Sequence, residues 1–209
     1  MSSTIKSNRI KGIMFIIASA LGFAMMSAFV KLAGDLPSFQ KVFFRNLVSA
    51  IIAFWLIIKH KGSLTGKKEN LKVLLYRSIF GTLGVIFNYY AIDKLMLSDA
   101  NMLNKMSPFL VVIFCAIALK EKINAKQIGA IIIAFIGALF IIKPTFSVEV
   151  IPYLGGIAGA VFAAMAYTCL RVLGDREDYY TIVFFFSVFS LVTVGPIAFA
   201  VYEPMTLMR

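Results

Sequence analysis

Polar side chains cluster in the stretch 97–144, inside runs that are otherwise apolar enough to cross a membrane. Asn101 and Asn104 are three residues apart, so they share one face of a helix, and Ser107 follows beside them. Amides and hydroxyls both donate and accept hydrogen bonds, which suits neutral or zwitterionic solutes. Hydrocarbon tolerates such groups only where protein or a water-filled cavity satisfies them. The pattern predicts a solute pathway, with interhelical hydrogen bonding as the alternative role.

Pro108 interrupts the same helix. Its ring nitrogen carries no N–H, so the carbonyl of Asn104 loses its partner one turn ahead. Asn104 therefore combines an unpaired carbonyl with a side-chain amide, and we predict a break in the helix here, with Pro108 in a gating or structural role.

Three further polar side chains are predicted to line the same cavity, namely Asn88, Tyr89 and Tyr167. Tyr89 and its neighbour Tyr90 have a second interpretation, because tyrosine at a helix end often belongs to the aromatic belt of the membrane surface. Arg45 lies inside the second apolar run. It either extends to the nearer interface as an anchor or acts as a gating or anion-attracting group.

The elements that must hold these side chains are transmembrane helices. The chain has 209 residues, of which 60% are hydrophobic, and a mean hydropathy of +0.89, well above a soluble domain. Seven apolar runs follow one another: 12–33, 39–58, 71–92, a run from 97, 127–142, a run from 152, and 179–201. The expected fold is an all-α polytopic membrane bundle.

Composition also excludes classes of function. The net charge of +11 is spread between the apolar runs, with no zinc spacing or RNA-binding motif, so no nucleic-acid partner is expected. The sequence has no HExxH or GxSxG motif, no phosphate-binding loop and one histidine, His60. We therefore expect no enzyme, no cofactor and no metal site. Cys115 and Cys169 are interpreted as small reduced hydrophobes.

Charge predicts the orientation of the chain. With seven spans, two thirds of the 21 Lys and Arg residues fall on the side of the N-terminus. Such an excess marks the cytoplasmic side, so we expect a multi-pass protein of the cytoplasmic (inner) membrane with its N-terminus inside.

Small residues at helical spacing predict close helix contacts. Gly155, Gly159 and Ala163 form a GxxxG-type face, and Ala130, Ala134 and Ala138 recur every fourth position in the run 127–142. Both faces are expected to pack against a neighbouring helix.

A weak internal repeat links the two ends of the chain. The segment 31–35 (KLAGD) aligns with 171–175 (RVLGD), and Phe43-Phe44 aligns with Phe184-Phe185. Five helices separate the copies, and an odd number inverts the second copy across the membrane. Inverted repeats of this kind are typical of secondary transporters, whose sites lie between the halves.

These residues resemble the EamA-type branch of the drug/metabolite transporter superfamily. The resemblance rests on Ser107-Pro108-Phe109, on Leu119-Lys120-Glu121-Lys122, and on Gln127, Gly129 and the segment 137–144. Glu121 takes the position of the family glutamate, in a gating or structural role, and Arg45 that of its second-helix arginine. Lys120 and Lys122 depart from the family's glycine and arginine at this turn.

The resemblance implies ten helices in two inverted halves of five. Residues 1–144 would then be the first half, and 150–209 the first two helices of a second half, as in a chain truncated after its seventh helix. The implied function is export or exchange of small polar metabolites, such as amino acids, by alternating access. The alternative is a non-transporting scaffold or an inactive transporter fragment, and a homodimer is one way to supply missing helices.

Overall fold

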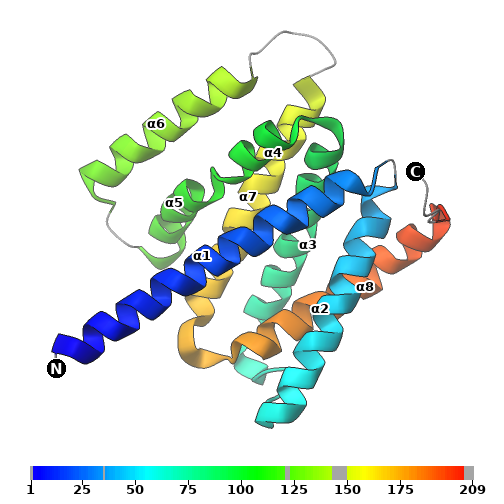
Figure 1. Cartoon of the computed structure of the whole chain (residues 1–209). Coiled ribbons are helices and arrows are strands. Elements are labelled where there is room, and N and C mark those ends of the chain that lie inside the picture. The colour runs from blue at the N-terminus through cyan, green and yellow to red at the C-terminus, as the bar shows by residue number, and fades with distance from the viewer. Residues whose placement is uncertain (1, 35, 121–122, 143–149, 205–209) are drawn as a thin grey trace.

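In the computed structural model of the chain (Figure 1), the structure describes residues 2–34, 36–120, 123–142 and 150–204, and the regular elements in these ranges are helices. They are α1 (Ser2–Leu32), α2 (Ser38–His60), η1 (Lys68–Asn70), α3 (Leu71–Lys94), α4 (Leu97–Asn104), α5 (Ser107–Leu119), α6 (Ala125–Ile142), α7 (Val150–Leu173), η2 (Gly174–Arg176) and α8 (Tyr179–Ala200). The expected all-α polytopic bundle is confirmed.

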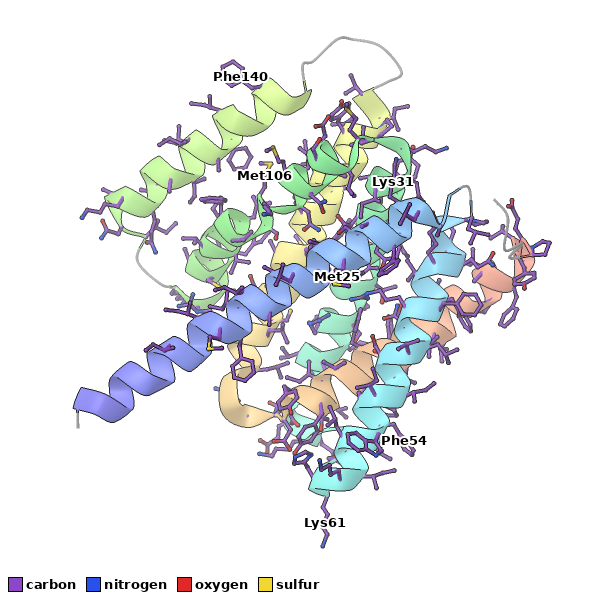
Figure 2. The ribbon with its side chains drawn as sticks, in the orientation of Figure 1. Met25, Lys31, Phe54, Lys61, Met106 and Phe140 are labelled. Carbon is purple, nitrogen blue, oxygen red and sulfur yellow. The ribbon has the colours of Figure 1, made fainter. Side chains whose placement is uncertain are left out.

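Hydrophobic surface covers the outside of the bundle. Among the described residues, six helical stretches are long and apolar enough to cross a membrane: Gly12–Leu32, Ser38–His60, Lys68–Lys94, Leu97–Leu119, Val150–Leu173 and Tyr179–Ala200. In α6 the stretch Ala125–Gly137 is apolar but shorter. Phe140 points away from the bundle (Figure 2) and is 76% exposed, and Phe15 of α1 is exposed to the same extent. In a bilayer these side chains face the lipid.

The most extensive contact between two helices in the described part of the chain is that of α3 with α7. A Cβ added to Gly84 would lie 3.0 Å from the backbone nitrogen of Ala163, and one added to Gly159 would lie 3.1 Å from that of Asn88. Side chains larger than hydrogen would therefore force the two backbones apart. The predicted contact face of Gly155, Gly159 and Ala163 is confirmed.

The second predicted contact face behaves differently. Gly129 and Gly137 of α6 have no atoms within 4 Å of an added Cβ. A crevice of about 580 Å³ lies between Ala130 and Ala134 on one side and the large side chains of Met102 in α4 and Phe109 in α5 on the other, and Figure 1 shows α6 standing apart from the rest. The prediction of close packing is wrong here, since bulky side chains face the small ones.

The predicted helix break separates α4 from α5. The N–H of Lys105 donates to the carbonyl of Asn101 at 3.1 Å, and that of Met106 donates to Leu103 at 3.0 Å, which closes α4 with a tighter turn. Pro108 then lies in the first turn of α5, where its missing N–H costs no hydrogen bond. The break leaves Asn104 at the end of a short helix.

The helices after residue 150 form one bundle with those before it. α7 packs on α3, and α8 packs on α2 and α3. The division into a repeat at 1–144 and an incomplete second repeat at 150–209 stays a prediction.

Polar side chains tie neighbouring segments together at both ends of the bundle. At one end, Glu177 accepts hydrogen bonds from the backbone of Lys67 at 2.8 Å and from the amide of Asn70 at 2.7 Å. At the other end, the ammonium of Lys41 pairs with Asp93 at 2.6 Å. A different set of polar residues lies in the middle of the bundle.

Candidate functional site

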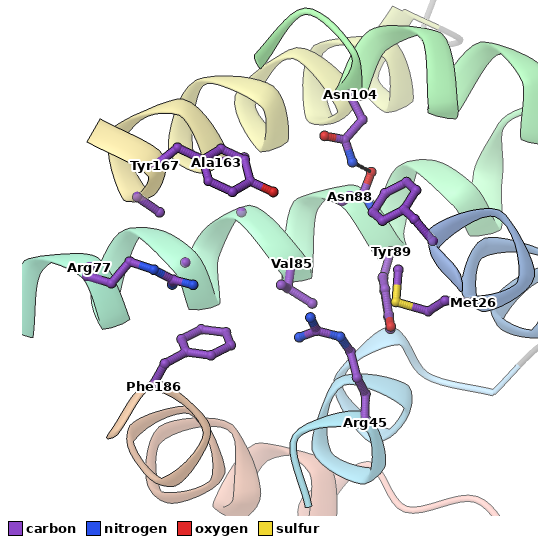
Figure 3. A pocket seen from close by; sticks show the side chains of 14 residues that line it. Met26, Arg45, Arg77, Val85, Asn88, Tyr89, Asn104, Ala163, Tyr167 and Phe186 are labelled. Atoms are coloured by element: carbon purple, nitrogen blue, oxygen red, sulfur yellow. Dashed lines mark hydrogen bonds between the residues drawn. The ribbon is translucent and has the colours of Figure 1, made fainter. Parts of the chain in front are cut away.

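A cavity of about 110 Å³ lies in the middle of the bundle, between α1, α2, α3, α4, α7 and α8 (Figure 3). It is lined by Phe23, Met26, Arg45, Arg77, Gly81, Gly84, Val85, Asn88, Tyr89, Asn104, Ala163, Ala166, Tyr167 and Phe186. Its wall therefore combines apolar side chains with amides, phenols and two guanidinium groups, which is the usual composition of a small-molecule site.

Two amides meet at one side of the cavity. The side-chain nitrogen of Asn104 donates to the side-chain oxygen of Asn88 at 2.8 Å (Figure 3). Asn88 is buried on α3 and Asn104 is half-buried at the end of α4. Because the helix breaks directly after Asn104, its amide projects from a terminus and reaches across to α3. The pair uses one donor and one acceptor, which leaves other capacity for a solute.

Two phenol rings also line the cavity. Tyr89 is only 1% exposed, so it lies inside the bundle and not in an aromatic belt at the membrane surface. Tyr167 of α7 is 50% exposed, and it lines a second opening as well as the cavity.

That second opening is a crevice of about 610 Å³ along α1. The predicted residues Asn101, Ser107 and Pro108 line it, and Ser27 of α1 donates a hydrogen bond to the amide oxygen of Asn101 at 3.2 Å. The cavity and the crevice share three lining residues, namely Phe23, Asn104 and Tyr167. The predicted site residues thus divide between two adjoining spaces, with Asn104 and Tyr167 at the boundary.

Arg45 turns into the cavity. Its guanidinium carbon lies 6.0 Å from the ring centre of Phe186, and that of Arg77 lies 4.6 Å from the same ring (Figure 3). Gly81 makes room for this arrangement, because an added Cβ would collide with the Arg77 guanidinium and lie 2.9 Å from the Phe186 ring. We refer to Arg45 and Arg77 as the arginine pair.

Sequence reasoning missed Arg77 and Phe186 as site residues. The charge count includes Arg77 only as one of the Lys and Arg residues on the side of the N-terminus. A signal was present, because Arg77 lies six residues inside a helix that is otherwise mostly apolar, and such a charge is expensive in a membrane unless it has a function. For Phe186 no signal existed, since phenylalanine is common throughout the run 179–201.

The arginine pair has little compensation from the protein. No acidic side chain is among the described residues that line the cavity. Arg45 donates one long hydrogen bond of 3.3 Å to Asn46, and the buried Nε of Arg77 has no hydrogen-bond partner in the described part of the chain. The cavity is therefore electropositive. Glu121, the remaining predicted residue, lies outside the described residues.

The fold and the cavity together define a polytopic helical membrane protein with an internal polar site. Residues 10–143 match the model of the EamA-like transporter family. The chain belongs to the EamA-like transporter family, which confirms the resemblance to the drug/metabolite transporter superfamily.

Similar proteins carry transporter names. The chain is 32% identical over 186 residues to the pseudopaline exporter CntI of Pseudomonas aeruginosa strain UCBPP-PA14, a match that covers 88% of this chain and 65% of that protein. It is 27% identical over 194 residues to human solute carrier family 35 member G1, with 87% of this chain and 53% of that protein covered. An uncharacterized transporter of Helicobacter pylori strain J99 is 27% identical over 179 residues, with 84% and 60% covered.

The chain spans less than two thirds of the length of these relatives. No solved structure matches it.

Proposed function

We propose that the chain carries the solute site of a membrane transporter, an exporter or exchanger of small polar metabolites such as amino acids that works by alternating access. It lies in the cytoplasmic membrane with its N-terminus inside, binds a solute and lipid, and performs no catalysis. The observation that carries this proposal is the central cavity, where Asn88, Asn104, Tyr89 and Tyr167 meet from three helices of a chain that belongs to a transporter family.

The two ends of the bundle support alternating access. Glu177 holds the loops at one end, and the ion pair of Lys41 with Asp93 holds the other. The cavity lies between these ties, so loosening one end at a time would expose it to one side of the membrane at a time. Asn104 stands at the break between α4 and α5, where a small rearrangement changes its reach without unwinding a long helix.

Flux through purified protein is the direct test. We expect the chain, reconstituted in proteoliposomes, to accelerate uptake or efflux of at least one solute from a panel of labelled amino acids and other small polar metabolites. Asn104→Leu should abolish that flux, because it removes the amide at the boundary of cavity and crevice. Flux at the level of protein-free liposomes for every solute would contradict transport by this chain and favour a scaffold.

Access of water to the cavity is a second, independent test. A cysteine at position 104, in a background without Cys115 and Cys169, should react with a membrane-impermeant thiol reagent, because Asn104 lines both the cavity and the crevice. Ile52→Cys is the matched control, since Ile52 is 55% exposed on the lipid-facing side of α2 and should not react. Equal protection at both positions would argue against an aqueous cavity.

A further inference from the structure

We infer that the central cavity is a binding site for a small organic anion with carboxylate groups, and that the arginine pair holds it. The inference rests on the proposed function, because it names the class of solute that the cavity would take. Neutral and zwitterionic solutes follow from the amides and hydroxyls alone. Two guanidinium groups in one cavity demand more negative charge than such solutes carry.

The first step of the argument is where the two charges lie. Arg45 is seven residues into α2 and Arg77 six residues into α3, each about 10 Å along its helix at a rise of about 1.5 Å per residue. α2 and α3 follow one another through a single loop and run in opposite directions. The arginines therefore approach the middle of the bundle from opposite ends, and they meet at the Phe186 ring (Figure 3).

The second step is that the protein leaves the guanidinium donors available. Contact with the Phe186 ring engages the flat guanidinium groups through their charge and not through their N–H groups, and among the described residues Arg45 uses one N–H, in the 3.3 Å bond to Asn46. Arginine carries five such donors, arranged to hold a carboxylate with two parallel hydrogen bonds. The Nε of Arg77 is buried without a hydrogen-bond partner in the described residues. At least one N–H donor inside the bundle is therefore available to a ligand.

The third step is that the described residues around the cavity do not supply the missing countercharge. None of the described lining residues is acidic, and the carboxylate of Asp93 pairs with Lys41 and accepts a hydrogen bond from Ser38 at 2.6 Å. A dianion would neutralise both arginines, a monoanion only one, and a neutral solute neither. Binding should therefore rank in that order.

The fourth step identifies the ligand as organic. Apolar side chains form the remaining wall, among them Met26 and Val85, and the amides of Asn88 and Asn104 lie across from the arginines (Figure 3). A carbon skeleton would contact the apolar wall, and polar substituents would reach the amides. An inorganic anion would use the arginines alone.

Binding of an isosteric series tests the charge. We would measure equilibrium binding of succinate, succinamate and succinamide to the purified full chain in lipid nanodiscs. These probes have nearly the same shape and carry two, one and no negative charges. We expect each added charge to tighten binding about tenfold, the lower end for a charge-assisted hydrogen bond. Equal binding of the three probes, stronger binding of succinamide, or no binding of any of them would overturn the inference.

Variants test whether the arginine pair holds the anion. Arg45→Gln and Arg77→Gln should each weaken succinate binding about tenfold or more, while succinamide binding changes little. Lys59→Gln is the matched control, because it also removes one positive charge and one cation–π contact, here with Trp55 at 5.0 Å, from the exposed C-terminal end of α2. Succinate binding that survives both arginine variants, or that falls equally in Lys59→Gln, would contradict the assignment.

Two further variants guard against misfolding. Arg77→Lys keeps the charge but loses the planar fork, so it should fold like the parent chain and bind succinate with intermediate affinity. Gly81→Ala leaves the arginine intact but crowds its guanidinium, and it should also weaken binding, whereas Gly129→Ala, with no atoms within 4 Å, should not. Full affinity in Gly81→Ala, with an unchanged unfolding temperature, would count against the proposed position of the anion.

Flux separates this inference from the proposed function. Succinate binding through the arginines, with no flux of succinate or of any solute in the panel, supports the anion site and contradicts transport by this chain. Flux of neutral solutes or amino acids, with no charge-dependent binding of succinate, overturns the anion site and leaves transport standing.

Discussion

Two sets of basic side chains in the helices differ in their surroundings. Lys41 pairs with Asp93 at 2.6 Å, and its side chain is 5% exposed. Lys31 donates to the backbone carbonyls of Ile92 and Leu95 at 2.8 and 2.9 Å, at the C-terminal end of α3. The arginine pair instead faces a cavity, with an aromatic ring between its members and no acidic residue in the described wall.

This difference indicates that the lysines stabilise the fold and that the arginines are available to bind a ligand. The lysines are satisfied by the protein itself, by a carboxylate and by the negative end of a helix dipole, so they fix the junction of α1, α2 and α3. A lone arginine at the centre of a membrane helix costs about 2.5 to 3.5 kcal/mol on insertion scales. A chain that places two of them around one cavity, with no countercharge among the described lining residues, has left room for a ligand to supply it.

The largest expected effect is on the lysine side of this comparison. Asp93→Ala leaves the ammonium of Lys41 buried without its partner and removes the acceptor of Ser38. We expect the free energy of unfolding to fall by about 3 to 5 kcal/mol, the usual cost of breaking a buried ion pair. Denaturant unfolding of the purified protein in detergent micelles measures this loss.

A double variant separates charge from packing at the same place. Lys41→Met with Asp93→Leu removes both partners and keeps most of their volume, so stability should return to within about 1 to 2 kcal/mol of the parent chain. A double variant as unstable as Asp93→Ala would show that shape, not charge, holds this junction, and the contrast with the arginine pair would lose its basis.

Substitution of two asparagines should lower the free energy of unfolding by an intermediate amount, and by more at one position than at the other. Asn46 is 0% exposed between α2 and α8, where its amide donates to the carbonyl of Val42 and the hydroxyl of Ser190, both at 2.9 Å. Asn104 makes one such bond, at 2.8 Å to Asn88, at the wall of the cavity. We expect Asn46→Ala to cost about 1 to 3 kcal/mol, because a buried hydroxyl loses its partner, and Asn104→Ala about 0.5 to 1.5 kcal/mol.

Thermal or denaturant unfolding of the two single variants, side by side, measures the difference. If Asn104→Ala destabilised the protein more than Asn46→Ala, the hydrogen bond between Asn88 and Asn104 would serve to hold α3 and α4 together. The cavity would then have no spare hydrogen-bonding capacity for a solute.

Sequence alone predicted the helices well because each depends on local information. Residues close together in the sequence determine the apolar runs of membrane length, the break at Pro108 and the glycine face of α7. The wall of the cavity depends on which helices meet. Asn88 and Asn104 could be named as polar residues in apolar runs, but their mutual contact could not. The predicted contact face of α6 shows the same limit. The bulky side chains opposite Ala130 and Ala134, among them Met102 and Phe109, belong to α4 and α5.

The contacts of the two arginines could not be predicted from sequence, because they involve a residue from a distant helix. Arg45 was recognised as a residue with two interpretations, and only its neighbour Phe186, from the other end of the chain, shows which way its charge points. Arg77 has a local signal, as a charge inside an apolar helix with Gly81 one turn further on, but its contact with Phe186 of α8 depends on which helices meet.

The smallest expected effect on stability is on the arginine side of the comparison. Arg77→Met removes a charge that no described carboxylate balances, and a flexible apolar chain of similar length replaces it. The lost ring contact and the relieved burial of charge act in opposite directions, so the free energy of unfolding should change by less than about 1 kcal/mol. The same measurement that detects Asp93→Ala should barely detect Arg77→Met. A loss of 3 kcal/mol or more would mean that Arg77 holds the bundle together, and the two sets of basic residues would then serve the same purpose.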